Sequence, residues 1–257
     1  MIRLCQNVEE QRNYDTEIKA VLFDMDGLMF DTERIGRECL LKAGHILSMK
    51  CLVPEKGSLS QEREAEADAK EEIEDELAAC YEELCGLNAK DTLEYMGSRW
   101  GYAWAQECLA LTDALMEDYL KLKGIPAKKG LRRLLAALQK RGISAAIVSA
   151  SSMDQIRENL EKNEIHHEFA CIVCGDMVRH SKPDPEGYLL AIRRLDLSPE
   201  QCIVLEDSRN GLIAGARAGC RTVLVPDMWV PEEGEAAEFI TWIGEDLEDV
   251  IALLPQE

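Results

Sequence analysis

Residues 19–33 read KAVLFDMDGLMFDTE, in which an apolar run is followed by three aspartates. The run over residues 20–23 predicts a buried strand, and Asp24 and Asp26 stand directly after it. Two carboxylates only two residues apart repel each other, so their presence at a strand end needs a reason. One interpretation is a strand that ends in a polar turn. The other is a nucleophile beside its proton-transfer partner.

The composition restricts the class of protein. With 257 residues, 46% of them hydrophobic, the chain can form one large domain or a domain with an insertion. The net charge of −20 and the lack of a basic stretch argue against nucleic acid and anionic membranes as partners. The chain lacks an apolar run of about 18 residues, which a transmembrane helix would need. The polar N-terminus lacks the apolar core of a signal peptide, so we expect a cytoplasmic protein.

The ten cysteines are scattered, and several lie inside apolar runs. Cys171 and Cys174 form a lone CxxC motif, whereas a zinc site would need a second pair of ligands. Disulfide frameworks belong mainly to small secreted domains. We therefore expect reduced, buried thiols that behave as small hydrophobic groups.

Five short apolar runs are typical of buried parallel strands, and segments with helical periodicity precede or separate the last four. Strands that alternate with helices in this way form a parallel sheet with helices on both faces. The sequence thus predicts an α/β fold, a Rossmann-like doubly wound parallel sheet. The expected strands are residues 19–23, 143–149, 170–174, 202–206 and 221–225, and the expected helices are 130–141, 153–162, 185–195 and 209–218.

The gap between the first two expected strands is far too long for one crossover, and most of it has helical character. This predicts an inserted all-α domain over residues 34–119, with the catalytic core formed by 1–33 and 120–257. Within the insertion, residues 55–83 are strongly acidic and rich in helix formers. That stretch could be a solvated helix or a partly disordered excursion.

Polar groups stand at the ends of three expected strands. These groups are Asp24 to Gly27 after the first expected strand, Ser149 to Ser151 after the second, and Glu206 to Ser208 after the fourth. The loop after the third expected strand carries Ser181 to Pro185. The carboxyl ends of parallel strands lie at one edge of a sheet, which is where open α/β sheets bind ligands. The four segments together therefore predict a single site.

These residue types suit the attack of a carboxylate on phosphorus. A carboxylate and a dianionic phosphate ester repel each other, and a Mg²⁺ ion held by oxygen ligands would offset that repulsion. Asp24, Asp207 and Glu206 can supply such oxygens. Lys182 adds a positive charge that can hold both the phosphoryl group and Asp24.

Three further groups have a role in this scheme. The Ser149 hydroxyl and the backbone N–H of Ala150 can donate hydrogen bonds to phosphoryl oxygens. Gly27 permits the turn that brings the backbone close to a ligand. Asp26 can protonate the leaving alkoxide and later accept a proton from the attacking water, as general acid and then general base.

The quoted pieces resemble a known family. FDMDG, IVSAS, HSKPDP and VLEDSRNGLIAGARAG are similar to the four signature motifs of the haloacid dehalogenase-like hydrolase superfamily. The narrower resemblance is to the branch with an α-helical cap domain inserted after the first motif, which includes β-phosphoglucomutase, phosphoglycolate phosphatase and sugar-phosphate phosphatases. It covers nearly the whole chain except the N-terminal dozen residues and the acidic stretch.

The resemblance implies a role for each matching residue. Asp24 would be the nucleophile, and Asp26 the acid and base, with its backbone carbonyl also on Mg²⁺. Ser149 and Lys182 would bind phosphate. Asp207 would be a metal ligand, and so would Glu206 nearby.

The resemblance also points to substrate contacts around the cap. Residues 31–33 would form the hinge into the cap, and Glu33 would face the substrate. Residues 85–93 resemble the substrate-specificity loop, from which we expect contacts by Asn88 and Lys90. Ser151 could contact substrate, although helix capping explains it equally well.

Two departures from the family pattern disfavour a mutase. Ala89 stands where β-phosphoglucomutase has a phosphate-clamping arginine, and Gly36 stands where it has a gating histidine. Lys90 or Arg99 could supply a substitute cation. Dehalogenases of the superfamily need no metal and generally lack the second aspartate, so Asp26 and Asp207 disfavour dehalogenation.

The sequence therefore predicts a cytoplasmic Mg²⁺-dependent phosphatase, a phosphoric monoester hydrolase that acts on a small phosphorylated metabolite such as a sugar or polyol phosphate. The expected route is an aspartyl-phosphate intermediate. Two alternatives stay open: phosphoryl transfer of the phosphoglucomutase type, and a non-catalytic phosphate-binding or regulatory module. We expect a monomer or weak dimer.

Overall fold

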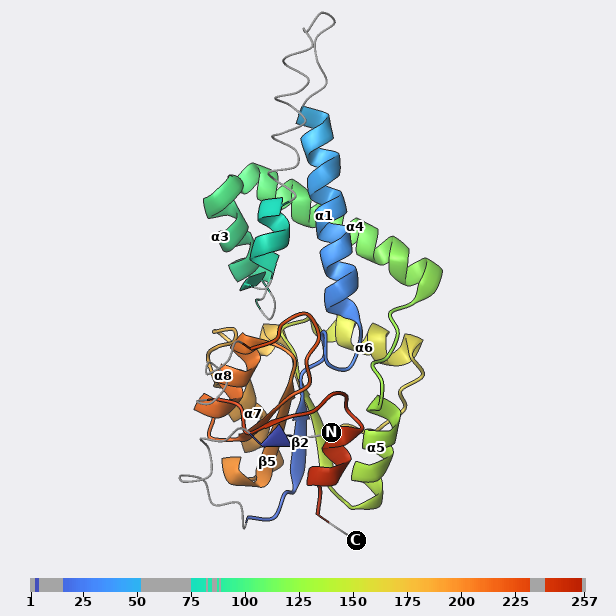
Figure 1. Ribbon diagram of the computed structural model, residues 1–257, viewed down its shortest axis with the longest axis vertical. Helices are drawn as coiled ribbons and strands as arrows, with labels where there is room; N and C mark the ends of the chain where they lie inside the picture. Colours follow the sequence, from blue (N-terminus) through green and yellow to red (C-terminus); the bar gives the residue numbers. More distant parts are fainter. Residues whose placement is uncertain are drawn as a thin grey trace, which may run out of the picture. The chain divides into compact units, whose positions relative to one another are not determined.

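The computed structural model describes residues 3–4, 16–51, 75–81, 83–84, 87, 89–231 and 239–255 (Figure 1). Most of the acidic stretch 55–83 lies outside the described residues, and so does Asn88. The chain forms two compact units. The core unit is Met1–Glu33, Gly86–Asn88 and Ile125–Glu257, and the inserted unit is Arg34–Cys85 and Ala89–Gly124.

The core unit is built on one sheet with the strand order β1-β7-β6-β5-β2-β3-β4. All pairs are parallel except β1 with β7. The chain runs from β2 outward to β3 and β4, and then returns to place β5 on the other side of β2. Strand order therefore reverses between β2 and β5, which is the position where doubly wound sheets bind ligands. The strands are β1 (Arg3–Leu4), β2 (Ala20–Phe23), β3 (Ser144–Val148), β4 (Cys171–Val173), β5 (Cys202–Glu206), β6 (Arg221–Leu224) and β7 (Trp242–Ile243).

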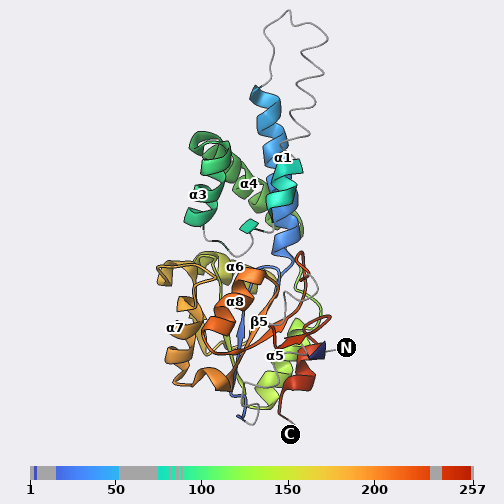
Figure 2. The same ribbon diagram turned by 60° about the vertical axis from the view of Figure 1, so that its left-hand side comes forward.

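Helices cover both faces of the sheet. Alternate strand residues such as Leu22 and Val204 pack against Tyr188 and Ala191 of α7 and Ala214 of α8. The amphipathic α5 lies across the sheet from α7 and α8 (Figures 1 and 2). The α/β fold class is thereby confirmed. The core helices are α5 (Leu131–Lys140), α6 (Met153–Lys162), α7 (Glu186–Leu195) and α8 (Arg209–Arg217), with short 3₁₀ helices at Gly175–Met177, Pro199–Gln201 and Asp249–Leu253.

The inserted unit is helical in its described part, with α1 (Thr32–Cys51), α3 (Ala89–Trp100) and α4 (Tyr102–Lys123). Two core-unit segments next to its entry and exit pair with each other. Phe30 forms a bridge with Ala127, and the backbone N–H of Lys128 donates to the carbonyl of Met29 at 2.8 Å. Among the described residues, every helix is too short or too polar to span a bilayer.

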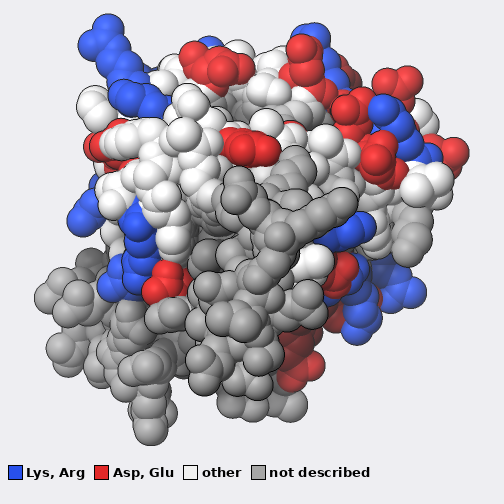
Figure 3. All heavy atoms as spheres, turned by 90° about the horizontal axis from the view of Figure 1, so that it is seen from above, with Lys and Arg blue, Asp and Glu red and all other residues white. Residues whose placement is uncertain are grey.

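Charged side chains of both signs lie next to each other over the described surface in view in Figure 3. On the helices of the inserted unit, Arg34 pairs with Glu38 at 2.9 Å and Lys121 with Glu117 at 2.6 Å. Exposed pairs one helical turn apart contribute little to stability. The stability of these helices therefore comes mainly from the apolar faces that pack against neighbouring residues.

The cysteines with a described thiol are buried, as the sequence predicted, and none of them forms a disulfide within the described part of the chain. They lie on β-strands, on helices or just beyond them. Burial raises the pKa of Cys108 to about 11 and that of Cys202 to about 12. Thiols of this kind are poor nucleophiles and poor metal ligands at neutral pH.

Candidate active site

The carboxyl edge of the sheet brings the predicted polar residues of three strands together. Phe23 is paired with Ile147 of β3 and with Leu205 of β5, so the chain leaves all three strands at the same level. Asp24, Ser149 and Asp207 follow these strands, and their exposed fractions are 7%, 5% and 4%. Polar side chains buried to this extent need partners, because an unpaired buried charge is costly.

Lys182 is the central cation of this edge. Its Nζ donates to Asp24 Oδ1 and, at 2.6 Å, to Glu206 Oε1. Burial alone would lower the pKa of Lys182, but the two carboxylates outweigh burial and raise it above its ordinary value. Lys182 therefore stays positively charged. An ammonium has three N–H donors, so this pair of contacts leaves one for a ligand.

Both oxygens of Glu206 accept hydrogen bonds. Oε1 accepts from the hydroxyl of Tyr188 at 2.5 Å as well as from Lys182, and Oε2 accepts from Ser208 Oγ at 3.1 Å. The sequence placed Ser208 in the polar group at a strand end without a role of its own, and it did not single out Tyr188. A tyrosine on the apolar face of an expected helix was the available signal, because a buried phenol requires a hydrogen-bond partner.

Asp26 lies beside two serines from the end of β3. Its Oδ2 accepts from Ser151 Oγ at 2.6 Å and from Ser149 Oγ at 3.3 Å. The interpretation of Ser151 as a helix cap is wrong, because Ser152 is the N-cap of α6 and forms a capping box with Gln155. Ser151 instead orients the carboxylate of Asp26.

The loop that carries Lys182 is anchored on both sides. Before it, Glu186 Oε2 accepts the backbone N–H groups of Arg179 and His180, each at 3.0 Å. After it, Arg217 from α8 donates to the carbonyl of Pro183 at 3.1 Å. These contacts fix the backbone from which Lys182 reaches Asp24.

Three carboxylates form an acidic cluster, defined here as Asp24, Glu206 and Asp207. One oxygen from each lies within 4.8 Å of the others. Asp207 Oδ1 is buried and has no hydrogen-bond partner in the described part of the chain. Burial, followed by the charge of Asp24, raises the pKa of Asp207. Burial and Glu206 raise the pKa of Asp24, and Lys182 opposes them.

Lys182 alone does not neutralise this acidic cluster, and a buried, unpartnered carboxylate oxygen is rare in folded proteins. Hard carboxylate oxygens are the ligands that Mg²⁺ prefers. The residues present therefore fit a divalent cation. Gly27, with φ +79°, keeps the space beside the cluster open, because a Cβ there would lie 2.1 Å from Asp207 Oδ2.

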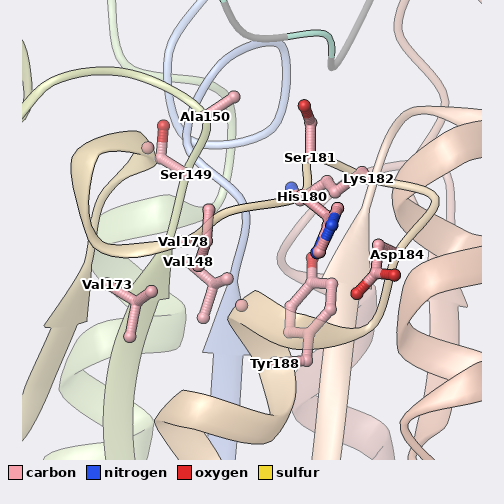
Figure 4. A pocket seen from close by; sticks show the side chains of 12 residues that line it. Val148, Ser149, Ala150, Val173, Val178, His180, Ser181, Lys182, Asp184 and Tyr188 are labelled. Atoms are coloured by element: carbon pink, nitrogen blue, oxygen red, sulfur yellow. The ribbon is translucent and has the colours of Figure 1, made fainter.

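A small pocket adjoins Lys182 (Figure 4). Ser149, Ala150 and Lys182 line it together with the ring of Tyr188 and a floor of valines. The groups predicted to bind phosphate thus share one cavity. Gly175 packs against the loop there, since a Cβ would lie 2.1 Å from the Ala150 carbonyl oxygen.

The predicted substrate contacts lie in different parts of the chain. Glu33 is in the first turn of α1, close to Gly27, and its charge acts on Asp207. Lys90 is exposed in the first turn of α3, in the inserted unit. Arg99 donates to the Tyr95 hydroxyl at 2.9 Å and lies over the ring of Trp100. Arg99 is thus already engaged within that unit.

The chain is similar in sequence to known phosphatases and similar in fold to solved structures. The chain is 27% identical over 216 residues to a phosphorylated carbohydrates phosphatase of Thermotoga maritima, covering 80% of this chain and 84% of that protein. It is 25% identical over 228 residues to hexitol phosphatase B of Escherichia coli, covering 87% and 89%. The crystal structure of CbbY from Rhodobacter sphaeroides in complex with phosphate has the same fold, with a TM-score of 0.62, 24% identity, and coverage of 92% and 99%.

A family model described as haloacid dehalogenase-like hydrolase matches residues 18–219. This range contains every residue of the acidic cluster, Asp26 with its two serines, and the loop that carries Lys182. It also spans the inserted unit. The chain therefore belongs to the haloacid dehalogenase-like hydrolase family.

Proposed function

We propose that this hydrolase is a Mg²⁺-dependent phosphatase that cleaves a small phosphorylated metabolite through an aspartyl-phosphate on Asp24. The enzyme class, a phosphoric monoester hydrolase, follows from the family and from relatives named as phosphatases. The observation that carries the mechanism is the buried pairing of Asp24 with Lys182, beside an Asp207 oxygen that the described part of the chain leaves without a hydrogen-bond donor.

In the first step, a carboxylate oxygen of Asp24 forms a bond to phosphorus, and the bond from phosphorus to the ester oxygen breaks. The departing alkoxide takes a proton from Asp26. Lys182, already on Asp24 Oδ1, offers its remaining N–H to a phosphoryl oxygen. Ser149 and the backbone N–H of Ala150 can donate to the other phosphoryl oxygens.

In the second step, water attacks the phosphorus of the aspartyl-phosphate and gives a proton to Asp26. The bond from phosphorus to the Asp24 oxygen breaks, which restores the carboxylate and releases inorganic phosphate. Asp26 is suited to both steps because Ser151 donates to one of its carboxylate oxygens at 2.6 Å, and this contact remains when the single hydroxyl hydrogen of Ser149 turns to a phosphoryl oxygen. This contact holds the Asp26 carboxylate in one orientation.

Asp24, Asp207 and the backbone carbonyl of Asp26 would hold Mg²⁺, with Glu206 nearby. When bound, the ion supplies positive charge that offsets the repulsion between the carboxylates and a phosphate dianion. Asp207 Oδ1, which has no hydrogen-bond partner among the described residues, supports this assignment. Glu206 supports it less directly, because both of its oxygens already accept hydrogen bonds.

The substrate class is a sugar or polyol phosphate. This proposal is supported by the relatives named for phosphorylated carbohydrates and for hexitol phosphates. Phosphoryl transfer of the mutase type would need a cation for a second phosphate. Lys90 and Arg99 are the two candidates for this cation, and Arg99 already contacts Tyr95 and Trp100. Because this contact engages Arg99 elsewhere, it favours hydrolysis over phosphoryl transfer.

A panel of hexitol, pentitol and hexose phosphates and phosphoglycolate, assayed with Mg²⁺, tests the proposal. Inorganic phosphate and isomerised sugar phosphates are followed in parallel, for the wild type and for Asp24→Asn. Release of phosphate by the wild type but not by Asp24→Asn is the expected result. Isomerisation without phosphate release would establish a mutase, and no turnover of any compound would favour the binding module.

Magnesium is expected to stabilise the protein through Asp207. A ligand at 100 times its dissociation constant adds about 2.7 kcal/mol to the free energy of unfolding. The thermal midpoint of EDTA-treated protein should therefore rise on Mg²⁺ addition. The rise should be largely absent in Asp207→Asn and preserved in Asp118→Asn, which removes the same charge from the exposed surface of α4. An equal rise in both variants would contradict the assignment.

A further inference from the structure

Tyr188 on α7 is a buried residue that the proposed mechanism does not use. Its exposed fraction is 1%, and its ring belongs to the hydrophobic cluster that joins α7 to the sheet. Its hydroxyl donates to Glu206 Oε1 at 2.5 Å. The Lys182 ammonium lies 5.3 Å from the centre of its ring. Tyr188 thus touches both members of the pair that faces Asp24.

Packing alone does not explain this hydroxyl. A phenylalanine would fill the same apolar space, and a buried phenol is costly unless it finds an acceptor. The acceptor here is the same Glu206 oxygen that binds Lys182 at 2.6 Å. Oε1 is therefore held between two donors, while Ser208 holds Oε2.

The position of Glu206 in turn determines where the Lys182 ammonium lies. A lysine side chain is long and flexible, and its ammonium is a compact charge without directional preference of its own. Two carboxylates fix it here, Glu206 on one side and Asp24 on the other. A Glu206 carboxylate that could rotate would draw the ammonium away from Asp24.

We propose that Tyr188 is a positioning residue whose hydroxyl fixes the Glu206 carboxylate and thereby directs Lys182 toward Asp24 and the phosphoryl group. This inference rests on the proposed role of Lys182 as a phosphate-binding cation. In the close-up view, Tyr188 and Lys182 lie on the same side of the pocket (Figure 4). The ring of Tyr188 makes a cation–π contact with the Lys182 ammonium, and the hydroxyl acts on Lys182 through Glu206.

The test is Tyr188→Phe, which keeps the ring and removes only the hydroxyl. One hydrogen bond to a charged group corresponds to about a 10- to 150-fold change, and because Tyr188 acts on Lys182 only through Glu206, kcat/KM should fall by about 3- to 30-fold. The inhibition constant of inorganic phosphate should rise by a similar factor, because Lys182 binds both the substrate and the product phosphate. Mg²⁺ affinity, measured by calorimetry, should stay unchanged.

Tyr102→Phe is the matched control. It removes an exposed hydroxyl that donates to Glu94 at 2.7 Å in the inserted unit, and it should change neither quantity. Assays are run well below the thermal midpoint of each variant. Unchanged kcat/KM and phosphate inhibition in Tyr188→Phe would overturn the inference, and so would an equal loss of Mg²⁺ affinity. If the wild type hydrolyses no phosphate ester, the proposed function has failed instead.

Discussion

Replacing Asp24 by Asn is expected to lower phosphate release by about 10³-fold or more, since loss of a nucleophile removes the covalent route. The amide has nearly the same shape as the carboxylate but is a far poorer nucleophile. The variant also loses the charge that holds Lys182 on that side of the site, so the ammonium is left with Glu206 alone. The fold should persist, because the change adds no volume to the buried edge of the sheet.

Two measurements separate chemistry from folding in this variant. Single-turnover assays with labelled substrate and an acid quench should trap phosphoprotein in the wild type and none in Asp24→Asn. Far-UV circular dichroism should be the same for both proteins. Asp118→Asn removes the same charge from the exposed surface of α4 and should retain full activity. Labelled phosphoprotein in Asp24→Asn would place the nucleophile elsewhere.

The central part of the fold could be predicted from the sequence because each of its strands is a short apolar run with a polar end. All five expected strands occur, as β2 to β6, and each of these five lies within its expected range. β1 and β7 have two residues each, which is too short for any periodic signal. The edge of the sheet beyond β6 therefore became known only from the structure.

The candidate site could be predicted only in part. The positions of the motifs after expected strands predicted that Asp24, Lys182 and Asp207 lie at one edge, because the carboxyl ends of parallel strands meet at the same edge of a sheet. Hydrogen bonds between remote side chains are different, since no local pattern encodes them. Asp26 and Ser151 are 125 residues apart in the chain, and Tyr188 looked like an ordinary core residue of an amphipathic helix.

Replacing Asp26 by Asn is expected to have an effect that depends on the leaving group. General acid–base catalysis contributes about 10²- to 10⁴-fold, and a hexitol phosphate needs it in both steps. Nitrophenyl phosphate needs it only in the second step, because nitrophenolate departs without a proton. The variant should therefore release about one nitrophenolate per enzyme molecule in a rapid burst and then turn over slowly.

Ser151→Ala provides the graded comparison for this prediction. It keeps the Asp26 carboxylate and removes the 2.6 Å hydrogen bond that orients it, so turnover of a hexitol phosphate should fall by about 10-fold. Asp26→Asn should retain the Mg²⁺-induced rise in thermal midpoint, because the expected metal contact of Asp26 is its backbone carbonyl. An equal loss for both esters without a burst would mean that Asp26 does not transfer the proton. Its two serine partners would then hold a carboxylate that only shapes the site.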